Sequence, residues 1–253
     1  MVDQLVQYSV DRGIARIALD SPRNRNALSA ALVAQLAVAL AETAADDSVR
    51  AVELTHTGST FCAGADLTEA SQGGMQAGAV RVVSLLKDIV ELPKPVVGSI
   101  DGHVRAGGLG LVGACDIVLA GPRSTFAFTE VKLGLAAAMI SLTTLPRLAP
   151  RAASRYYLTG ETFDAATAAR IGLVTEAVED IDAGTMVVLD ALRAASPQGL
   201  RMTKPLLTGA ILDGFDARAK AMAELSARLF ASEEAAEGMA AFLAKRPPPW
   251  AAG

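Results

Sequence analysis

The sequence predicts an α/β fold whose body is followed by a helical carboxyl-terminal region. Short runs rich in Val, Ile and Leu alternate with helical segments in the order strand, glycine turn and helix over about the first 180 residues. Beyond that point the pattern is helical only, with a break at 196–199 and an end at 246–250. We therefore predict a body over residues 1–195 and a helical region over 196–253. The chain of 253 residues is long enough to bury a substantial core.

The first elements are a hairpin and a helix. Leu5 to Val10 and Ile14 to Leu19 predict two strands joined by a turn at 11–13. The loop that follows carries Arg23 and Arg25. Ser29 then predicts the N-cap of a helix, because leucines recur at i, i+4 spacing after it.

Two later strands end in glycine-rich turns. Ala51 to Thr55 predicts one strand, and the run from Pro95 to Ile100 predicts another. The first leads into a turn at 56–67, and the second leads into a turn around Gly107 that opens a short helix. If the two strands lie side by side and parallel, both turns emerge at the same edge of the sheet, where ligands bind in open α/β folds.

The remaining body is predicted to be mostly helical. We expect a flexible loop at 71–78 and an amphipathic helix over 80–91, and residues 68–90 are expected to shape the variable part of a substrate pocket. A helix of small residues is predicted over 133–142, another over 151–158, and a helix ended by Gly172 before a short strand.

Composition argues against several classes of function. The net charge is −4 and the pI is near 5.3, whereas nucleic-acid and anionic-membrane binders show a basic excess. The longest charge-free apolar stretch, 133–146, is shorter than the roughly 20 residues of a spanning helix. The amino-terminal sequence lacks the basic segment and apolar run of a secretory signal. We expect a cytoplasmic protein with neither nucleic acid nor a membrane as partner.

Disulfide and metal chemistry are not expected. Cys62 and Cys115 each lie beside strand-like apolar sequence, which favours two reduced core thiols. The two histidines, His56 and His103, show no metal-ligand spacing. Cys62 has no identifiable paired base, so we do not expect it to act as a nucleophile.

The candidate site lies between Pro95 and Glu130. Gly107, Gly108 and Gly110 leave backbone N–H groups uncovered at a helix start, where they can approach an anionic ligand atom. Seventeen residues after Gly113 comes Glu130, a carboxylate with apolar neighbours. Bare donors beside one acid are typical of enolate chemistry.

Two other interpretations of these glycines compete with an oxyanion site. The run 108–113 matches the dinucleotide fingerprint G-x-G-x-x-G, but the preceding strand is predicted to end near Ile100 and the next begins at Ile117, so the long helix of that motif does not fit. The glycines alternatively serve only close packing of helix on sheet, and spacing alone does not separate this from an oxyanion site.

Several motifs together resemble the crotonase superfamily, the enoyl-CoA hydratases and isomerases. They occur in the family's order over essentially the whole chain: Phe61-Cys-Ala-Gly-Ala-Asp-Leu67, Gly102-His-Val-Arg-Ala-Gly-Gly-Leu-Gly110, Ala114-Cys-Asp-Ile117, Phe126-Ala-Phe-Thr-Glu-Val-Lys-Leu-Gly134, Leu158-Thr-Gly-Glu-Thr-Phe163, Ala168-Ala-Arg-Ile-Gly-Leu-Val174 and Phe242-Leu-Ala-Lys-Arg246. The resemblance implies a crotonase-like spiral of ββα units with a carboxyl-terminal helical trimerisation region, assembled as a homotrimer or as a homohexamer of two trimers.

The resemblance also implies a function and a set of site residues. The reaction is addition of water across the 2,3 double bond of an enoyl-CoA thioester through an oxyanion-stabilised enolate. Glu130 matches the catalytic glutamate, and the N–H groups of Ala65 and Gly107 match the oxyanion pair. No separate cofactor is expected, because coenzyme A is part of the substrate. Contacts to the substrate and its coenzyme A are expected from Arg23, Arg25, Ala63, Asp66, Leu67, Gly108, Phe242 and Lys245.

The chain departs from the family's pattern at Gly110. Hydratases of fatty-acid oxidation carry a second glutamate there, so one acid must both orient water and deliver the proton. Two alternatives stay open: a Δ3,Δ2-enoyl-CoA isomerase, which needs one glutamate, and a non-catalytic acyl-CoA-binding member. The pattern around Gly110 also resembles bacterial hydratases for branched acyl groups, of the methylglutaconyl-CoA type.

Three polar residues near these turns remain to be placed. His103 and Arg105 are candidates to replace the missing acid's interactions with water, although structural roles are the simpler interpretation. Asp66 is expected to stabilise the helix start that it occupies.

Overall fold

The computed structural model describes residues 3–71 and 75–251 of the chain. Its strands form two sheets, a six-stranded sheet in the order β1-β2-β3-β5-β7-β10 and a four-stranded sheet in the order β4-β6-β8-β9. The strands are β1 Val6–Asp11, β2 Ile14–Leu19, β3 Ala51–His56, β4 Thr60–Cys62, β5 Val96–Ile100, β6 His103–Arg105, β7 Ile117–Ala120, β8 Thr125–Ala127, β9 Phe163–Asp164 and β10 Glu176–Ala177.

Helices connect and cover these strands. The α-helices are α1 Ala30–Ala45, α2 Leu67–Ser71, α3 Met75–Glu91, α4 Gly107–Ala114, α5 Ser141–Thr144, α6 Pro150–Thr159, α7 Ala165–Arg170, α8 Ile181–Ala194, α9 Pro197–Phe230 and α10 Glu233–Leu243. Three 3-10 helices complete the set: η1 Pro22–Asn24, η2 Thr129–Leu133 and η3 Pro249–Ala251.

The body repeats one supersecondary unit. A strand of the six-stranded sheet is followed by a short strand of the other sheet and then by a helix, as in β3, β4 and α2, in β5, β6 and α4, and in β7, β8 and η2. The strands β2, β3, β5 and β7 are parallel, and so are β4, β6 and β8. This arrangement is the predicted α/β spiral of ββα units.

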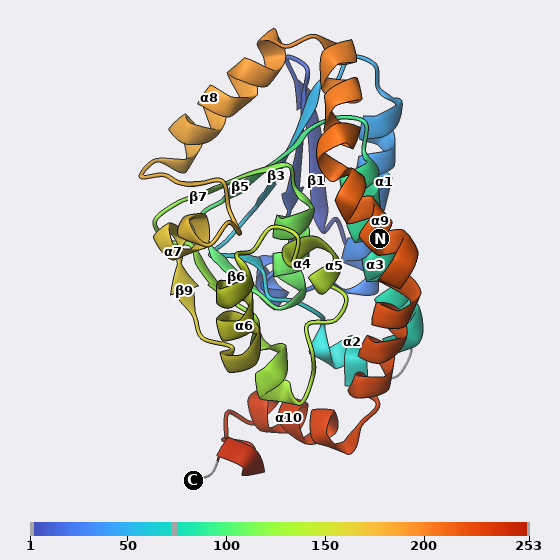
Figure 1. The fold of residues 1–253 in the computed structure, drawn as a ribbon, viewed down its shortest axis with the longest axis vertical. Coiled ribbons are helices and arrows are strands. Elements are labelled where there is room, and N and C mark those ends of the chain that lie inside the picture. Colours follow the sequence, from blue (N-terminus) through green and yellow to red (C-terminus); the bar gives the residue numbers. More distant parts are fainter. Residues whose placement is uncertain (1–2, 72–74, 252–253) are drawn as a thin grey trace.

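Helices cover both faces of the six-stranded sheet (Figure 1). Helix α8 packs on β3, β5 and β7 from one side, while α1 packs on β1 and β2 and contacts α3 on the other. Helix α4 lies between the sheets and is buried from Gly108 to Ala114. The core therefore surrounds the glycine-rich helix that carries the candidate site.

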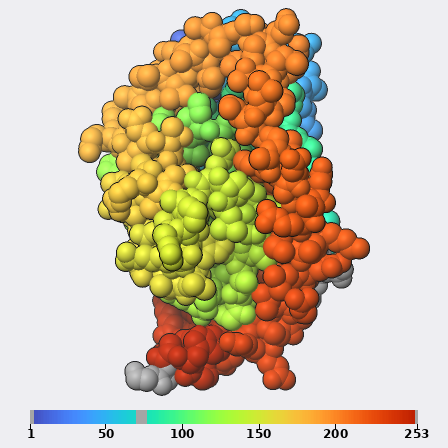
Figure 2. Space-filling model, in the orientation of Figure 1, coloured from blue at the N-terminus to red at the C-terminus, as the bar shows by residue number. Residues whose placement is uncertain are grey.

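The helical tail packs on the body of its own chain. Helix α9 runs along α3 and α5, and α10 turns beneath them onto η2. In the space-filling view the tail forms the right edge and the foot of the molecule (Figure 2). A helical tail after an α/β body is expected to pack either on that body or on a neighbouring subunit, and here it packs on the body of its own chain.

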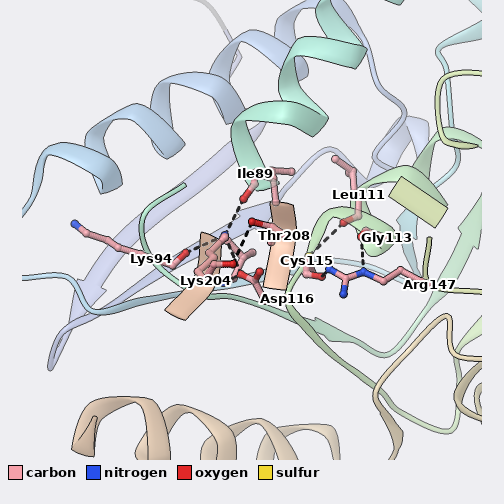
Figure 3. Close-up of polar contacts among 10 residues, drawn as sticks. Ile89, Lys94, Leu111, Gly113, Cys115, Asp116, Arg147, Lys204 and Thr208 are labelled. Carbon is pink, nitrogen blue, oxygen red and sulfur yellow. Dashed lines mark hydrogen bonds and ion pairs between the residues drawn. The ribbon is translucent and has the colours of Figure 1, made fainter. Parts of the chain in front are cut away.

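A buried ion pair fastens α9 to the sheet (Figure 3). The Lys204 Nζ lies 2.8 Å from the Asp116 Oδ2 and donates to the carbonyl oxygens of Ile89 at 2.9 Å and Lys94 at 3.2 Å. The same Asp116 oxygen accepts the N–H of Val96 at the start of β5. Burial lowers the pKa of the Lys204 ammonium, and Asp116 opposes that shift.

Several predicted elements are confirmed. The hairpin, the Ser29 cap and the short glycine-rich helix form as expected, with the Ser29 Oγ accepting the N–H of Leu32. Strands β3 and β5 are neighbours and parallel, as the convergence of the two turns requires. Both cysteines are free and buried.

Three predictions of local structure were wrong. Residues 133–142 are not one helix, because Gly134 is left-handed at φ +70° and ends η2, and only Ser141–Thr144 is α-helical beyond it. The described residues of the loop predicted at 71–78 are helical, because Ser71 ends α2 and α3 begins at Met75, while residues 72–74 lie outside the described residues. All strands of the second sheet, β4, β6, β8 and β9, were missed because two or three residues are too few to show an alternating pattern, and β4 lies inside the turn predicted at 56–67.

None of the helices in the described ranges, 3–71 and 75–251, is long and apolar enough to cross a membrane.

Candidate active site

The two glycine-rich turns meet at the edge where β4 and β6 end. A side chain on Gly64 would begin 2.8 Å from the Ala106 Cβ, and one on Gly107 would begin 3.7 Å from the Ala65 nitrogen. Both turns are anchored: the Leu28 N–H donates to the Gly64 oxygen at 2.8 Å, and the Ala106 N–H donates to the Ala127 oxygen at 3.1 Å. Only glycine permits this approach, so the turns converge as predicted.

The predicted oxyanion donors are therefore close together. Gly107 is the first residue of α4, whose first N–H groups have no partner within the helix and carry the positive end of its dipole. The Ala65 N–H donates no hydrogen bond among those formed by residues 3–71 and 75–251. Two adjacent backbone donors without partners have the arrangement that can stabilise a developing oxyanion.

The residue before helix α4 has a strained backbone conformation. Ala106, the N-cap of α4, has φ +46° and ψ −121°, a conformation that favours glycine. Non-glycine residues in such regions cost about 1–3 kcal/mol and cluster at functional sites. The helix that follows begins beside the other turn, where a Cβ on Gly64 would lie 3.2 Å from the Gly107 nitrogen.

Glu130 lies at the start of η2, on the segment that leaves β8. Its Oε2 is buried and has no hydrogen-bond partner within the described part of the chain. Burial raises the pKa of Glu130 to about 7, and the lowering by its own backbone N–H offsets only part of that effect. The fully buried rings of Phe126 and Phe128 precede it, as the sequence predicted. The carboxyl group is thus poised to gain and lose a proton near neutral pH.

Sequence reasoning missed an aromatic and hydroxyl layer behind Glu130. The Tyr157 ring lies 4.3 Å from the Phe128 ring, and its hydroxyl lies 2.5 Å from the Thr144 Oγ1. Thr144 donates its single proton to the Ile140 oxygen, so it accepts from Tyr157. Tyr157 therefore donates its phenol proton to Thr144, and this proton is not available for a hydrogen bond to Glu130. A tyrosine inside a helix gave no sequence signal for this role.

Gly110 lies where the family pattern suggested a second glutamate. A Cβ at this position would lie 2.6 Å from the Ile140 Cγ2 and 3.2 Å from the Leu86 Cδ1. Both neighbours are core side chains, with 2% and 0% of their surface exposed. Hydrocarbon therefore occupies the direction in which a second acid at this position would extend.

The loop with Arg23 and Arg25 adjoins the Ala65 turn. The Arg25 oxygen accepts the N–H of Ala63 at 3.1 Å. Asn26, fully buried, fixes the loop by accepting from the Ser21 N–H and donating to the oxygens of Thr57 and Thr60. Asn26 was missed because a loop asparagine has many ordinary roles.

A second unsatisfied oxygen lies in the same loop. The Asn24 Oδ1 is buried without a hydrogen-bond partner among the described residues, and its Nδ2 lies 3.5 Å from the Asp66 Oδ2. Asp66 Oδ1 accepts the N–H groups of Thr68 and Glu69, so its predicted role at the helix start is confirmed. Leu67 is the first residue of that helix.

The tail residues predicted to contact coenzyme A lie at the end of α10. Phe242 is 52% exposed and Lys245, at φ +51°, follows the helix end. Arg246 makes a paired contact with Glu237, at 2.6 and 3.2 Å, which folds the chain back after Lys245. Arg23, Arg25 and Lys245 are exposed, and none belongs to an ion pair of the described residues.

The side chains of His103 and Arg105 form hydrogen bonds with residues of β6 and β8. The His103 Nδ1 lies 2.8 Å from the Thr125 Oγ1, and the Arg105 guanidinium donates to that hydroxyl, to the Thr125 oxygen and to the Val104 oxygen. These contacts tie β6 to β8 and favour structural roles for both. Gly108 is buried against Cys62, where a Cβ would lie 2.8 Å from the Cys62 oxygen, so packing accounts for this glycine.

Two close backbone donors and one carboxyl group with a raised pKa are the groups that an α/β enzyme needs to stabilise an oxyanion and to move a proton. The family model for enoyl-CoA hydratase/isomerase matches residues 9–253. The chain belongs to the enoyl-CoA hydratase/isomerase family, as its motifs predicted.

Similar proteins cover nearly the whole chain. An enoyl-CoA hydratase from Mycobacterium avium has a solved structure with 53% identity and a TM-score of 0.92, covering 98% of this chain and 100% of that one. A second enoyl-CoA hydratase structure, from Shewanella pealeana, shows 31% identity and a TM-score of 0.78, covering 98% and 96%. The mevalonyl-coenzyme A hydratase of Aspergillus fumigatus is 31% identical over 94% of this chain and 91% of that protein.

Proposed function

We propose that this protein is an enoyl-CoA hydratase-like lyase that adds water across the 2,3 double bond of an enoyl-CoA thioester. The observation that carries the proposal is Glu130, a buried carboxyl group with an unpartnered Oε2 and a pKa raised to about 7. The Ala65 and Gly107 N–H groups, which lie close to one another, supply the donors that an enolate oxygen requires. Family membership and the enoyl-CoA hydratases among the similar structures support this assignment.

The proposed reaction uses one acid for two tasks. Glu130 holds a water molecule, takes one of its protons and directs the remaining hydroxide oxygen to C3 of the substrate. The electrons of the double bond move to C2 and the thioester oxygen, where the Ala65 and Gly107 donors stabilise the negative charge. Glu130 then gives its proton to C2, so one water is added in full. A donor pair of this kind contributes roughly 3–4 kcal/mol per hydrogen bond in the transition state.

Coenzyme A is proposed to bind between the loop at 21–26 and the tail. The exposed cations Arg23, Arg25 and Lys245 supply positive charge for its phosphates on a chain whose net charge is −4. Ala63, Asp66, Leu67 and Gly108 are proposed to contact the substrate from the turn, and Phe242 from the tail. No separate cofactor is needed for this chemistry.

The proposed assembly is a homotrimer or a homohexamer. Apolar side chains on α9, including Leu206 at 83% and Leu207 at 67% exposure, support contact with a second copy. Sedimentation equilibrium would measure the mass directly, and a monomer at micromolar concentration would contradict the assembly. Free cysteines in the core support the cytoplasm, a reducing compartment, as the location.

The test is mass spectrometry of straight and branched 2-enoyl-CoA thioesters incubated with the protein in deuterated water. Hydration predicts a product heavier by one deuterated water, and Glu130→Gln should lower its rate by about 10²–10⁴-fold. Glu179→Gln, an exposed acid, is the matched control and should retain full activity. Deuterium gained without water would instead identify a double-bond shift, and full activity of Glu130→Gln would refute the role of Glu130.

A further inference from the structure

The 3-10 helix that carries Glu130 lies between two elements that press on its backbone. Helix η2 spans only Thr129–Leu133, and it contacts α6 on one side and α10 on the other (Figure 1). A helix of this length has too few internal hydrogen bonds to hold its shape alone. The position of Glu130 therefore depends on what packs against η2.

A glycine makes the contact at each end of η2. Gly160, which ends α6 at φ +60°, lies against the residue before η2, and a Cβ there would be 3.1 Å from the Phe128 oxygen. Gly238, in the middle of α10, lies against the last residue of η2. A Cβ on Gly238 would be 2.5 Å from the Leu133 oxygen and 2.6 Å from its carbonyl carbon.

The contact with α10 continues into the turn after η2. A Cβ on Gly134 would lie 2.9 Å from the Glu234 carbonyl carbon and 3.0 Å from the Ala235 nitrogen. The N–H groups of Gly134 and Leu135 both donate to the backbone carbonyl oxygen of Glu130. Displacement of this turn would therefore move the backbone of Glu130 itself.

We propose that Gly238 is a positioning residue: by letting α10 lie directly on the Leu133 carbonyl, it fixes η2 and places the Glu130 carboxyl group in its buried position. This inference rests on the proposed role of Glu130 in catalysis. It assigns the tail a task beyond contact with coenzyme A, because α10 holds the acid of its own chain in place.

Gly238→Ala adds one methyl group that has no space. Because its contacts are backbone atoms, α10 or η2 must shift, and a misplaced catalytic group lowers turnover by about ten- to a hundredfold. We expect kcat to fall by that factor while KM changes by less than about twofold, and the pH midpoint of activity to move below about 7 as solvent reaches Glu130. The control is Gly209→Ala in α9, where nothing lies within 4 Å of the added methyl.

Amide hydrogen exchange provides a readout that does not depend on activity. Gly238→Ala should speed exchange of the Gly134 and Leu135 N–H groups, whereas Gly209→Ala should leave both unchanged. If the wild type hydrates no enoyl-CoA, the proposed function fails, while faster exchange at these two amides still supports the positioning role. Wild-type kcat together with unchanged exchange in Gly238→Ala would overturn it.

Ser232→Ala keeps the inference testable if Gly238→Ala does not fold. The Ser232 Oγ caps α10 by accepting the Ala235 N–H at 3.2 Å, so its loss loosens α10 without adding bulk. We expect faster exchange at Gly134 and Leu135 and a kcat reduced by about two- to fivefold. Faster exchange within α10 that leaves these two amides and kcat unaffected would contradict the role of α10.

Discussion

Replacing Glu130 by glutamine should change how the protein's stability depends on pH. Burial raises the pKa of Glu130 to about 7 from an ordinary value of 4.5, so the folded state holds a proton that the unfolded chain has lost between these values. Stability from this group is complete below pH 4.5 and is lost as pH rises through 7. Each pH unit of difference corresponds to about 1.4 kcal/mol, which sets an upper value of about 3 kcal/mol for the full effect.

In Glu130→Gln the side chain keeps nearly the same shape but cannot ionise. Urea unfolding of both proteins from pH 4.5 to pH 8 isolates the effect as a difference, because Glu53 and Asp88, whose pKa values burial also raises, are present in both. We expect the variant to gain up to about 3 kcal/mol relative to the wild type across this range. A difference that stays constant within about 0.5 kcal/mol would show that Glu130 ionises as a solvated acid, and would refute the proton-holding role derived from its burial.

Three further changes test the substrate site, the tail and the single-acid site. Lys245→Ala should raise KM for an enoyl-CoA about tenfold and leave kcat nearly unchanged in steady-state assays, because it removes a phosphate contact remote from the chemistry. Lys204→Ala should cost about 3–5 kcal/mol in urea unfolding because it leaves Asp116 buried and unpaired, and a simultaneous Asp116→Asn should recover part of that loss. Gly110→Glu should destabilise the fold by more than about 3 kcal/mol in thermal unfolding, because its Cβ would lie 2.6 Å from the Ile140 Cγ2 and its carboxylate would be buried among hydrocarbon.

Much of the fold could be predicted because its long strands carry local signals. Ile14–Leu19 is apolar except at Arg16, Ala51–Leu54 is apolar except at Glu53, and most positions of both strands are buried. The second sheet had no such signal, since β6 and β8 contain three residues each and β9 only two. Their pairing follows from the strands of the first sheet, which deliver the chain to the same edge.

The candidate site, like the fold, could be predicted from the sequence only in part. Glycines beside a helix start predicted the converging turns, and the apolar neighbours of Glu130 in the sequence agree with the burial that raises its pKa. The sequence could not show that Ile140 fills the space beside Gly110, because the two residues are 30 positions apart and their contact depends on tertiary packing. The commitment of Tyr157 to Thr144 depends in the same way on how α5 meets α6.

Burial of Glu130 explains how one acid can serve where the family pattern suggested two. At pH 7 a carboxyl group with a pKa of 4.5 is protonated in only about 0.3% of molecules, whereas one with a pKa of about 7 is protonated in about half. The same group can then take a proton from water and return it to carbon without a large cost in either direction. A second carboxylate nearby would repel the negative charge of ionised Glu130 and would raise the pKa of Glu130 further. The hydrocarbon packed at Gly110 therefore keeps a second charge away from this position, and in the proposed reaction the raised pKa of Glu130 compensates for the absent acid.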